Sequence, residues 1–149
     1  MLKVRVKISQ PNSGEELHLV STERLLAVID SKDLACRSSK EIKDAFHIYW
    51  FTENDEYEKE FIAPSLYISK GIAYFMNGRH RTVLLSKYLK EIPLRLAGLE
   101  GSAFSTKEDL KLSTRVLKEI SIRKIEPQDE FEFPDLRIEY LGYDVNLGK

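Results

Sequence analysis

Apolar and charged side chains alternate at the start of the chain. Residues 2–8 have the sequence LKVRVKI, so every second side chain is apolar. A period of two is typical of a strand that buries one face. The turn-forming segment Pro11–Gly14 follows, and Leu17–Val20 is then predicted to be the returning strand.

The middle of the chain has the clearest pattern. Two apolar and aromatic runs, 61–68 and 72–76, flank Ser69-Lys70-Gly71, which predicts a β-hairpin. Asn77-Gly78 interrupts the second run, and the spacing of apolar side chains then favours a helix from about His80 to Lys90. The expected core unit is therefore a hairpin, a tight turn, a helix and a further strand.

The other expected elements are less sharply patterned. Thr106 is the predicted N-cap of a second helix, whose acidic first turn suits the helix dipole. The remaining expectations are an apolar segment of ambiguous type at 25–29, a helix start near 39–46, an aromatic strand at 48–51, a strand opened by Ile122 and Ile125, an acidic loop at 126–135, and a closing strand at 136–141.

Composition narrows the class of protein. The chain has 149 residues, with 23 Lys and Arg against 24 Asp and Glu, which fits one domain and excludes a generally basic coat for nucleic acid. Its single cysteine, Cys36, excludes an internal disulfide framework and favours a reducing cytoplasm. No apolar run approaches the length of about 20 residues that spans a bilayer, so no membrane partner is expected.

The chemistry of the chain concentrates in residues 77–82, with the sequence NGRHRT. Gly78 permits an abrupt turn, and the first turn of the following helix offers unpaired N–H groups at the positive end of its dipole. Arg79, His80 and Arg81 bring two guanidinium groups and an imidazole to a place where cations oppose the dipole unless an anion is present. The pattern predicts an anion site, above all for phosphate or polyphosphate. The alternative is that these are ordinary surface residues at a helix start.

Residues 61–97 resemble the core of the ParB/sulfiredoxin superfamily. The similarity lies in FIAPSLYI at 61–68, YFMNGRHR at 74–81 and IPL at 92–94. That family has a Gly-x-His-Arg or Gly-x-Arg-Arg box at a helix start, then a helix and an Ile-Pro-Val-like strand. A weaker similarity runs from Ile29-Asp30 to Arg37, and residues 98–149 form a C-terminal extension of unknown role.

The resemblance implies a single ParB/sulfiredoxin-like α+β domain over residues 1–149, with a mixed sheet and a phosphate-binding turn at a helix N-terminus. Members of the family bind ATP or CTP with the phosphates at the box, and Mg²⁺ is the expected companion of such a ligand. By position, the phosphate contacts fall to Gly78, Arg79, His80, Arg81 and Thr82, with Arg37 and Ser38 joining from the earlier loop.

Arg79 departs from two patterns of the family. Sulfiredoxins have their reactive cysteine at this position, so the resemblance does not imply sulfiredoxin activity. Chromosome-partitioning ParB proteins have a glutamate there, so the acid of their CTPase is missing too. Nucleoside-triphosphate hydrolysis is a further hypothesis that needs a carboxylate or another base. The catalytic candidates are His80 and Asp30, with Asp33, Glu53, Asp55 and Glu56 as other carboxylates, and the histidines have no metal-ligand spacing.

Two other classes of function stay open. A nucleic-acid binder or nuclease would use the cationic turn on a backbone phosphate, with Tyr49, Trp50 and Phe51 stacking on bases. Its basic surface would include Lys3, Arg5, Lys7, Arg95, Lys107 and Lys111. A plasmid- or phage-type regulatory or inhibitory protein would act through a protein partner, with the acidic stretches 53–60 and 126–135 as candidate surfaces.

Overall fold

The computed structural model describes residues 3–12, 14–30, 32, 45–53, 59–97, 106–126, 129–134, 136–140 and 143–145. The elements in chain order are β1 (Lys3–Ile8), β2 (Glu15–Ser21), α1 (Thr22–Val28), β3 (Phe46–His47), the 3₁₀ turn η2 (Ile48–Trp50), β4 (Phe51–Glu53), β5 (Lys59–Phe61), β6 (Ser65–Ser69), β7 (Ile72–Asn77), α3 (Arg79–Ser86), β8 (Glu91–Ala97), α4 (Lys107–Ile120), β9 (Ser121–Lys124), β10 (Glu130–Pro134), β11 (Ile138–Tyr140) and β12 (Tyr143–Val145).

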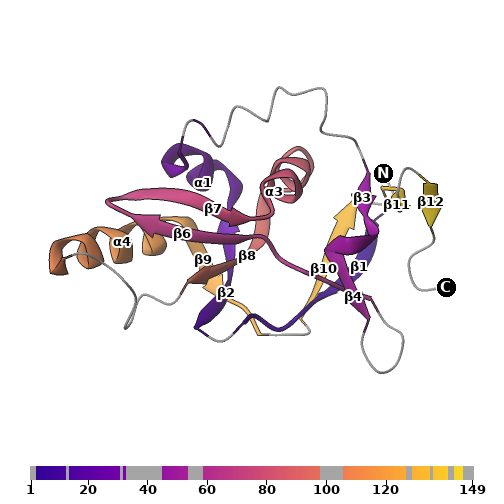
Figure 1. The fold of residues 1–149 in the computed structure, drawn as a ribbon, viewed down its shortest axis with the longest axis horizontal. Coiled ribbons are helices and arrows are strands. Elements are labelled where there is room, and N and C mark those ends of the chain that lie inside the picture. Colours follow the sequence, from indigo (N-terminus) through magenta and orange to yellow (C-terminus); the bar gives the residue numbers. More distant parts are fainter. Residues whose placement is uncertain are drawn as a thin grey trace.

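The described strands form three sheets, with the orders β7-β6-β8-β2-β9, β10-β1-β5-β4 and β12-β11-β3. Each sheet contains parallel and antiparallel neighbours. In Figure 1, α1 and α3 lie together over one side of the first sheet, and the β1, β4 and β10 strands lie beyond the end of β7. The fold is therefore a mixed α+β fold, which confirms the predicted class.

The predicted hairpin is confirmed. Strands β6 and β7 pair antiparallel, and Ser69 opposite Ile72 leaves Lys70 and Gly71 as the loop. Both loop residues have positive φ, 52° and 79°, as a tight hairpin turn requires. The amide N–H of Lys70 donates to the carboxylate of Asp109 over 2.6 Å, so α4 holds this turn in place.

The helix after the hairpin ends earlier than the pattern predicts, at Ser86 rather than Lys90. The segment that follows it docks against α1 instead. Thr22 donates its amide to the carbonyl of Lys90 over 2.9 Å and its hydroxyl to the carbonyl of Leu89 over 2.9 Å. Residues 25–28 of the ambiguous segment belong to helix α1, with Ser21 as its N-cap, and Ile29 is its extended C-cap residue, which forms a parallel bridge with Ala73.

Two strand predictions are wrong in part, one in the partner of the strand and one in its extent. The segment at 17–20 is a strand, but β2 pairs with β8 and β9 and does not return along β1. The run at 61–68 is two strands, β5 and β6, which lie in different sheets. The chain crosses between the sheets at Ile62, Ala63 and Pro64, where proline has no N–H to give to a ladder.

The aromatic strand predicted at 48–51 is also wrong for its first part. Ile48–Trp50 forms the 3₁₀ turn η2, and the strand β4 begins only at Phe51. The ring of His47 explains the turn, because its Nδ1 accepts the amide N–H of Tyr49 over 3.2 Å. The helix start predicted near 39–46 falls mainly on residues outside the described ranges.

The C-terminal part of the chain is built into the same core as the rest. Strand β9 joins the sheet of β2, and β10 pairs with β1 along its length, so the loop prediction for 126–135 is wrong over β10. Val116, Ile120, Ile125 and Phe133 are buried in one cluster with the core residues of the earlier strands. The helix at Thr106 is confirmed, since the Thr106 hydroxyl accepts the amide of Asp109 over 3.0 Å.

No helix within the described ranges is long and apolar enough to cross a membrane.

Candidate functional site

The turn between β7 and α3 depends on Gly78. Its φ of 94° lies in the left-handed region, and it is the residue before the first turn of α3. A Cβ built on it would lie 2.7 Å from the Cβ and 2.8 Å from the Cα of Pro64. Glycine is required at this position both for the backbone conformation and for the close approach of the crossover segment.

Arg81 is the buried cation of the box. Only 5% of its surface is exposed, and its guanidinium donates a hydrogen bond to the carbonyl oxygen of Ile62. No carboxylate of the described residues forms an ion pair with it, so its buried charge has no balancing anion among them. Burial of a charge in this state is unfavourable unless a counter-ion is supplied.

The electrostatics of Arg81 reflect this environment. Burial, and then the nearby charge of Arg95, lower the pKa of Arg81 to about 10. The shift corresponds to a cost on the order of 3 kcal/mol for the charged form. Because the folded-state pKa lies below the ordinary value of arginine, the cost is present at all pH values below about 10 and disappears as the pH rises from there toward that ordinary value.

Arg95 is buried in a different manner, with a carboxylate beside it. Its Nη1 lies 3.4 Å from Oε1 of Glu15, and its Nε donates to the carbonyl of Ala63 over 2.7 Å. The second carboxylate oxygen of Glu15 accepts the hydroxyl of Ser65 over 2.8 Å. Because 7% of Arg95 is exposed, the prediction that it extends a basic surface for nucleic acid is wrong.

The crossover between the two sheets is held by these two arginines. The carbonyls of Ile62 and Ala63 accept from the side chains of Arg81 and Arg95, and the carbonyl of Pro64 accepts the amide of Arg95 over 2.7 Å. The carbonyls of Ile62 and Ala63 lie between the two ladders, and arginine side chains supply their donors. The local fold thus places Arg81 against the crossover and fixes its guanidinium.

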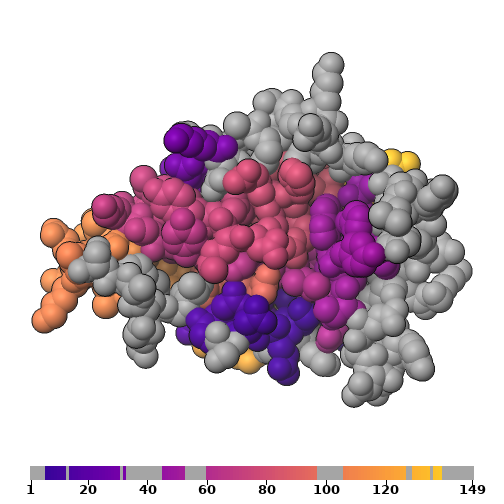
Figure 2. Space-filling model, viewed as in Figure 1, coloured from indigo at the N-terminus to yellow at the C-terminus, as the bar shows by residue number. Residues whose placement is uncertain are grey.

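A pocket of about 370 Å³ lies where α3 begins. Its described lining comes from the box, the crossover and the 3₁₀ turn η2: Tyr49, Trp50, Ile62, Asn77, Gly78, Arg79, His80 and Arg81. Figure 2 shows the purple surface of the η2 segment beside the pink surface that holds the box. The volume falls within the range of about 300–1,000 Å³ that is typical of small-molecule pockets.

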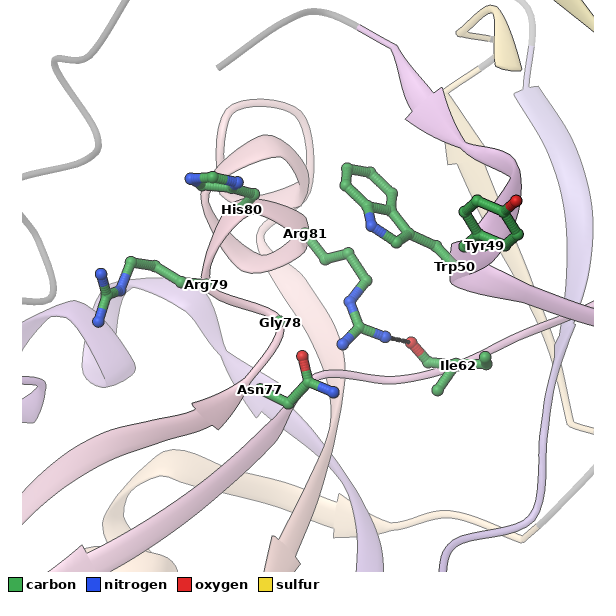
Figure 3. A pocket seen from close by; sticks show the side chains of 8 residues that line it. All are labelled: Tyr49, Trp50, Ile62, Asn77, Gly78, Arg79, His80 and Arg81. Carbon is green, nitrogen blue, oxygen red and sulfur yellow. Dashed lines mark hydrogen bonds between the residues drawn. The ribbon is translucent and has the colours of Figure 1, made fainter. Parts of the chain in front are cut away.

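The three cations of the box line this pocket, but their charged ends do not converge as the sequence suggested. Figure 3 shows the guanidinium of Arg81 directed toward Ile62, while Arg79 and His80 extend to the other side of α3. Arg79 and His80 are exposed. Arg81 is therefore the fixed charge of the pocket, and Arg79 and His80 lie at its rim.

The remaining predicted site residues fall elsewhere or outside the description. Thr82 is buried, and its hydroxyl donates to the carbonyl of Gly78 over 3.0 Å, so it stabilises the first turn of α3. Asp30 lies after α1 and accepts the amide of Lys32 over 3.0 Å, and it is not among the residues that line the pocket. Arg37, Ser38, Cys36, Asp33, Asp55 and Glu56 lie outside the described residues, as does the side chain of Glu53.

The aromatic wall of the pocket was not predicted as part of a nucleotide site. Trp50 and Tyr49 come from η2, about thirty residues before the box. The ring of Tyr49 is stacked on His47 with centroids 5.0 Å apart, and 62% of this tyrosine is exposed. The sequence signal was the aromatic run at 48–51, which strand periodicity alone could not relate to the distant box.

No carboxylate is among the described residues that line the pocket. The described part of the chain also has no group of three or more His, Cys, Asp or Glu side chains arranged to hold a metal ion. Within the described lining, the oxygen ligands that Mg²⁺ prefers would thus come from the phosphates of the bound molecule.

A second polar cluster joins β2 to β9. Nδ1 of His18 lies 2.8 Å from the hydroxyl of Ser121, and Nε2 lies 3.0 Å from Oε2 of Glu16. The hydrogen bond with His18 lowers the pKa of Glu16, with a further contribution from Lys124. The connectivity resembles a hydrolase relay, but the amide of Ser121 donates to Leu117 and is not available to stabilise an oxyanion. The cluster fits a structural role.

Comparison of the chain with protein-family models, with curated proteins and with solved structures gives no match. The resemblance to the ParB/sulfiredoxin superfamily therefore stays a prediction that rests on the box and its strand–turn–helix setting.

Proposed function

We propose that the pocket at the start of α3 binds the phosphates of a nucleoside triphosphate, ATP or CTP, and that Arg81 supplies the main charge. One observation carries the proposal: Arg81, a residue that is only 5% exposed, lines the pocket without a carboxylate partner among the described residues. A phosphate is the anion whose geometry suits this group, because the guanidinium fork can donate to two phosphate oxygens.

The start of α3 adds donors to the same site. The first N–H groups of a helix have no partner within the helix, and the residue before α3, Gly78, has no side chain that could cap them. The dipole of the helix favours negative charge at this end. Arg79 and His80 are exposed at the rim, where they can approach the outer phosphates of a longer ligand.

The proposal covers binding and does not include hydrolysis. Phosphoryl transfer to water needs a group that orients or deprotonates the attacking water. Asp30, the carboxylate candidate that lies within the described residues, does not line the pocket, and His80 points away from Arg81 in Figure 3. The residues of the pocket thus account for charge neutralisation and positioning of the ligand alone.

A single-stranded nucleic acid is the second candidate, favoured by the aromatic side chains that share the pocket with Arg81. Aromatic platforms beside cations are how proteins bind single strands without sequence preference. Burial of Arg95 against Glu15 removes one member of the basic surface that such a strand would follow.

Calorimetric titration with ATP and CTP, with and without Mg²⁺, tests the proposal. We expect the wild type to bind and Arg81→Met to bind at least about tenfold more weakly, because a hydrogen bond to a charged group contributes about 1.5–3 kcal/mol. Arg123→Met is the matched control, since Arg123 is half exposed and lies 3.7 Å from Asp129, outside the pocket lining. Absence of binding to the wild type, or equal binding by Arg81→Met, would contradict the proposal.

A further inference from the structure

The wall opposite the box is aromatic and is held rigidly. The indole of Trp50 makes an edge-to-face contact with Phe46, with centroids 6.3 Å apart and planes at 87°. Phe46 is itself buried in the core. In Figure 3 the indole extends from η2 toward Arg81, which comes from α3. Trp50 is therefore anchored at one edge and borders the pocket with the rest of its ring.

Ile62 fixes the aromatic wall and the buried charge relative to each other. Its amide N–H donates to the carbonyl of Trp50 over 2.8 Å, and its own carbonyl accepts the guanidinium of Arg81. One peptide segment thus holds both groups. A ligand that meets both gains from this arrangement, because the backbone that carries Trp50 and the side chain of Arg81 are already positioned by the same residue.

We infer that Trp50 is the stacking platform for the base of a nucleotide whose phosphates lie at Arg81. This inference rests on the proposed phosphate site and adds the part of the ligand that the site selects. A planar π-system next to a buried guanidinium suits a ligand that is planar and apolar at one end and anionic at the other. Stacking is tolerant of base identity, so the platform selects nucleotides over inorganic polyphosphates and does not separate ATP from CTP.

The size of the pocket favours a mononucleotide over a strand. Its volume of about 370 Å³ lies near the lower end of small-molecule sites, whose range is about 300–1,000 Å³. Tyr49 lines the same pocket and stacks on His47, so the aromatic surface continues at the rim.

Trp50 is the single tryptophan of the chain, so its fluorescence reports directly on this wall. Titration of the wild type with ATP should change the Trp50 emission in parallel with calorimetric binding. Inorganic tripolyphosphate should bind with little change in emission. We expect ATP to bind about 5- to 150-fold more tightly than tripolyphosphate, the range that corresponds to one stacked base.

Substitutions separate the base from the phosphates. In Trp50→Leu, the affinity for ATP should fall to the level of the affinity for tripolyphosphate. The affinity for tripolyphosphate should be the same as in the wild type. Trp50→Phe should retain part of the preference for ATP over tripolyphosphate. This variant tests the inference if Trp50→Leu fails to fold. Tyr67→Leu is the matched control, because Tyr67 is an exposed aromatic that stacks on Tyr74 and does not line the pocket.

The outcomes of these titrations distinguish a failure of the base platform from a failure of the proposed phosphate site. If ATP and tripolyphosphate bind equally in the wild type and in the Trp50 variants, the base platform is wrong and the phosphate site stands. If neither ligand binds, the phosphate site itself is wrong. An oligothymidylate that binds more than tenfold more tightly than ATP would overturn the mononucleotide in favour of a single strand.

Discussion

Arg95→Met should lower the free energy of unfolding by about 3–5 kcal/mol, the usual cost of removing one partner of a buried ion pair. The substitution leaves the carboxylate of Glu15, which is itself largely buried, without the guanidinium 3.4 Å away. It also removes the donor that the carbonyl of Ala63 accepts from. Both losses fall in the crossover between the two sheets.

Arg81→Met should change the free energy of unfolding far less, by about 1 kcal/mol or under. The carbonyl of Ile62 loses its donor, which costs about 1–3 kcal/mol for a buried acceptor. The substitution also removes a buried charge without a carboxylate partner, whose unfavourable burial is of similar size. In Arg81→Met these two effects oppose each other. In Arg95→Met the loss of the ion pair with Glu15 and the loss of the donor to Ala63 both destabilise the fold.

Urea unfolding of the two variants beside the wild type measures this difference. The two substitutions are identical in type, so the comparison isolates the presence of a carboxylate partner. Equal losses of several kcal/mol in both variants would show that the charge of Arg81 is balanced within the protein. That result would remove the reason to expect an anion in the pocket.

Gly78→Ala should cost about 2–5 kcal/mol and disturb the pocket. A φ of 94° is strained for any residue with a Cβ, by about 1–2 kcal/mol. The new methyl group would also lie 2.7 Å from the Cβ of Pro64, which a packed crossover cannot relieve without shifting, at a further cost of about 1–3 kcal/mol. Because the residues that line the pocket flank Gly78, ATP binding should weaken with stability.

Gly71→Ala is the matched control for this substitution. Gly71 has a φ of 79°, and a Cβ there would meet nothing within 4 Å. Gly71→Ala should therefore lose only the stability that backbone strain costs, about 1–2 kcal/mol, with ATP binding unchanged. Thermal unfolding with and without ATP measures both effects, and equal losses in the two variants would refute the close approach of Pro64 to Gly78.

The sequence was most informative where local signals agreed with one another. The loop at Lys70-Gly71, the cap at Thr106 and the break at Gly78 each have a chemical cause within a few residues, and each lies where it was predicted. The α+β class with a mixed sheet was expected from the family resemblance, and the succession of hairpin, helix and strand agrees with it.

Tertiary contacts decided the features that the sequence could not predict. The run at 61–68 has the pattern of one strand, and its division depends on Arg81 and Arg95 taking the carbonyls of the crossover from distant parts of the chain. The orientation of Arg79 away from Arg81 is likewise a consequence of helical geometry in α3. Trp50 lines the same pocket as the box, although the two segments are far apart in the sequence. Hydrophobic periodicity is a local pattern and holds no information about this proximity.

The most direct measurement is an NMR titration of ¹⁵N-labelled protein with ATP, followed at the backbone amides of residues 79–82 and at the Nε–H of Arg81. We expect these signals to shift together and to saturate with the calorimetric affinity, while the Nε–H of Arg123 stays in place. Saturable binding that leaves Arg81 and the first turn of α3 unmoved would place the ligand elsewhere and contradict a phosphate site at this pocket.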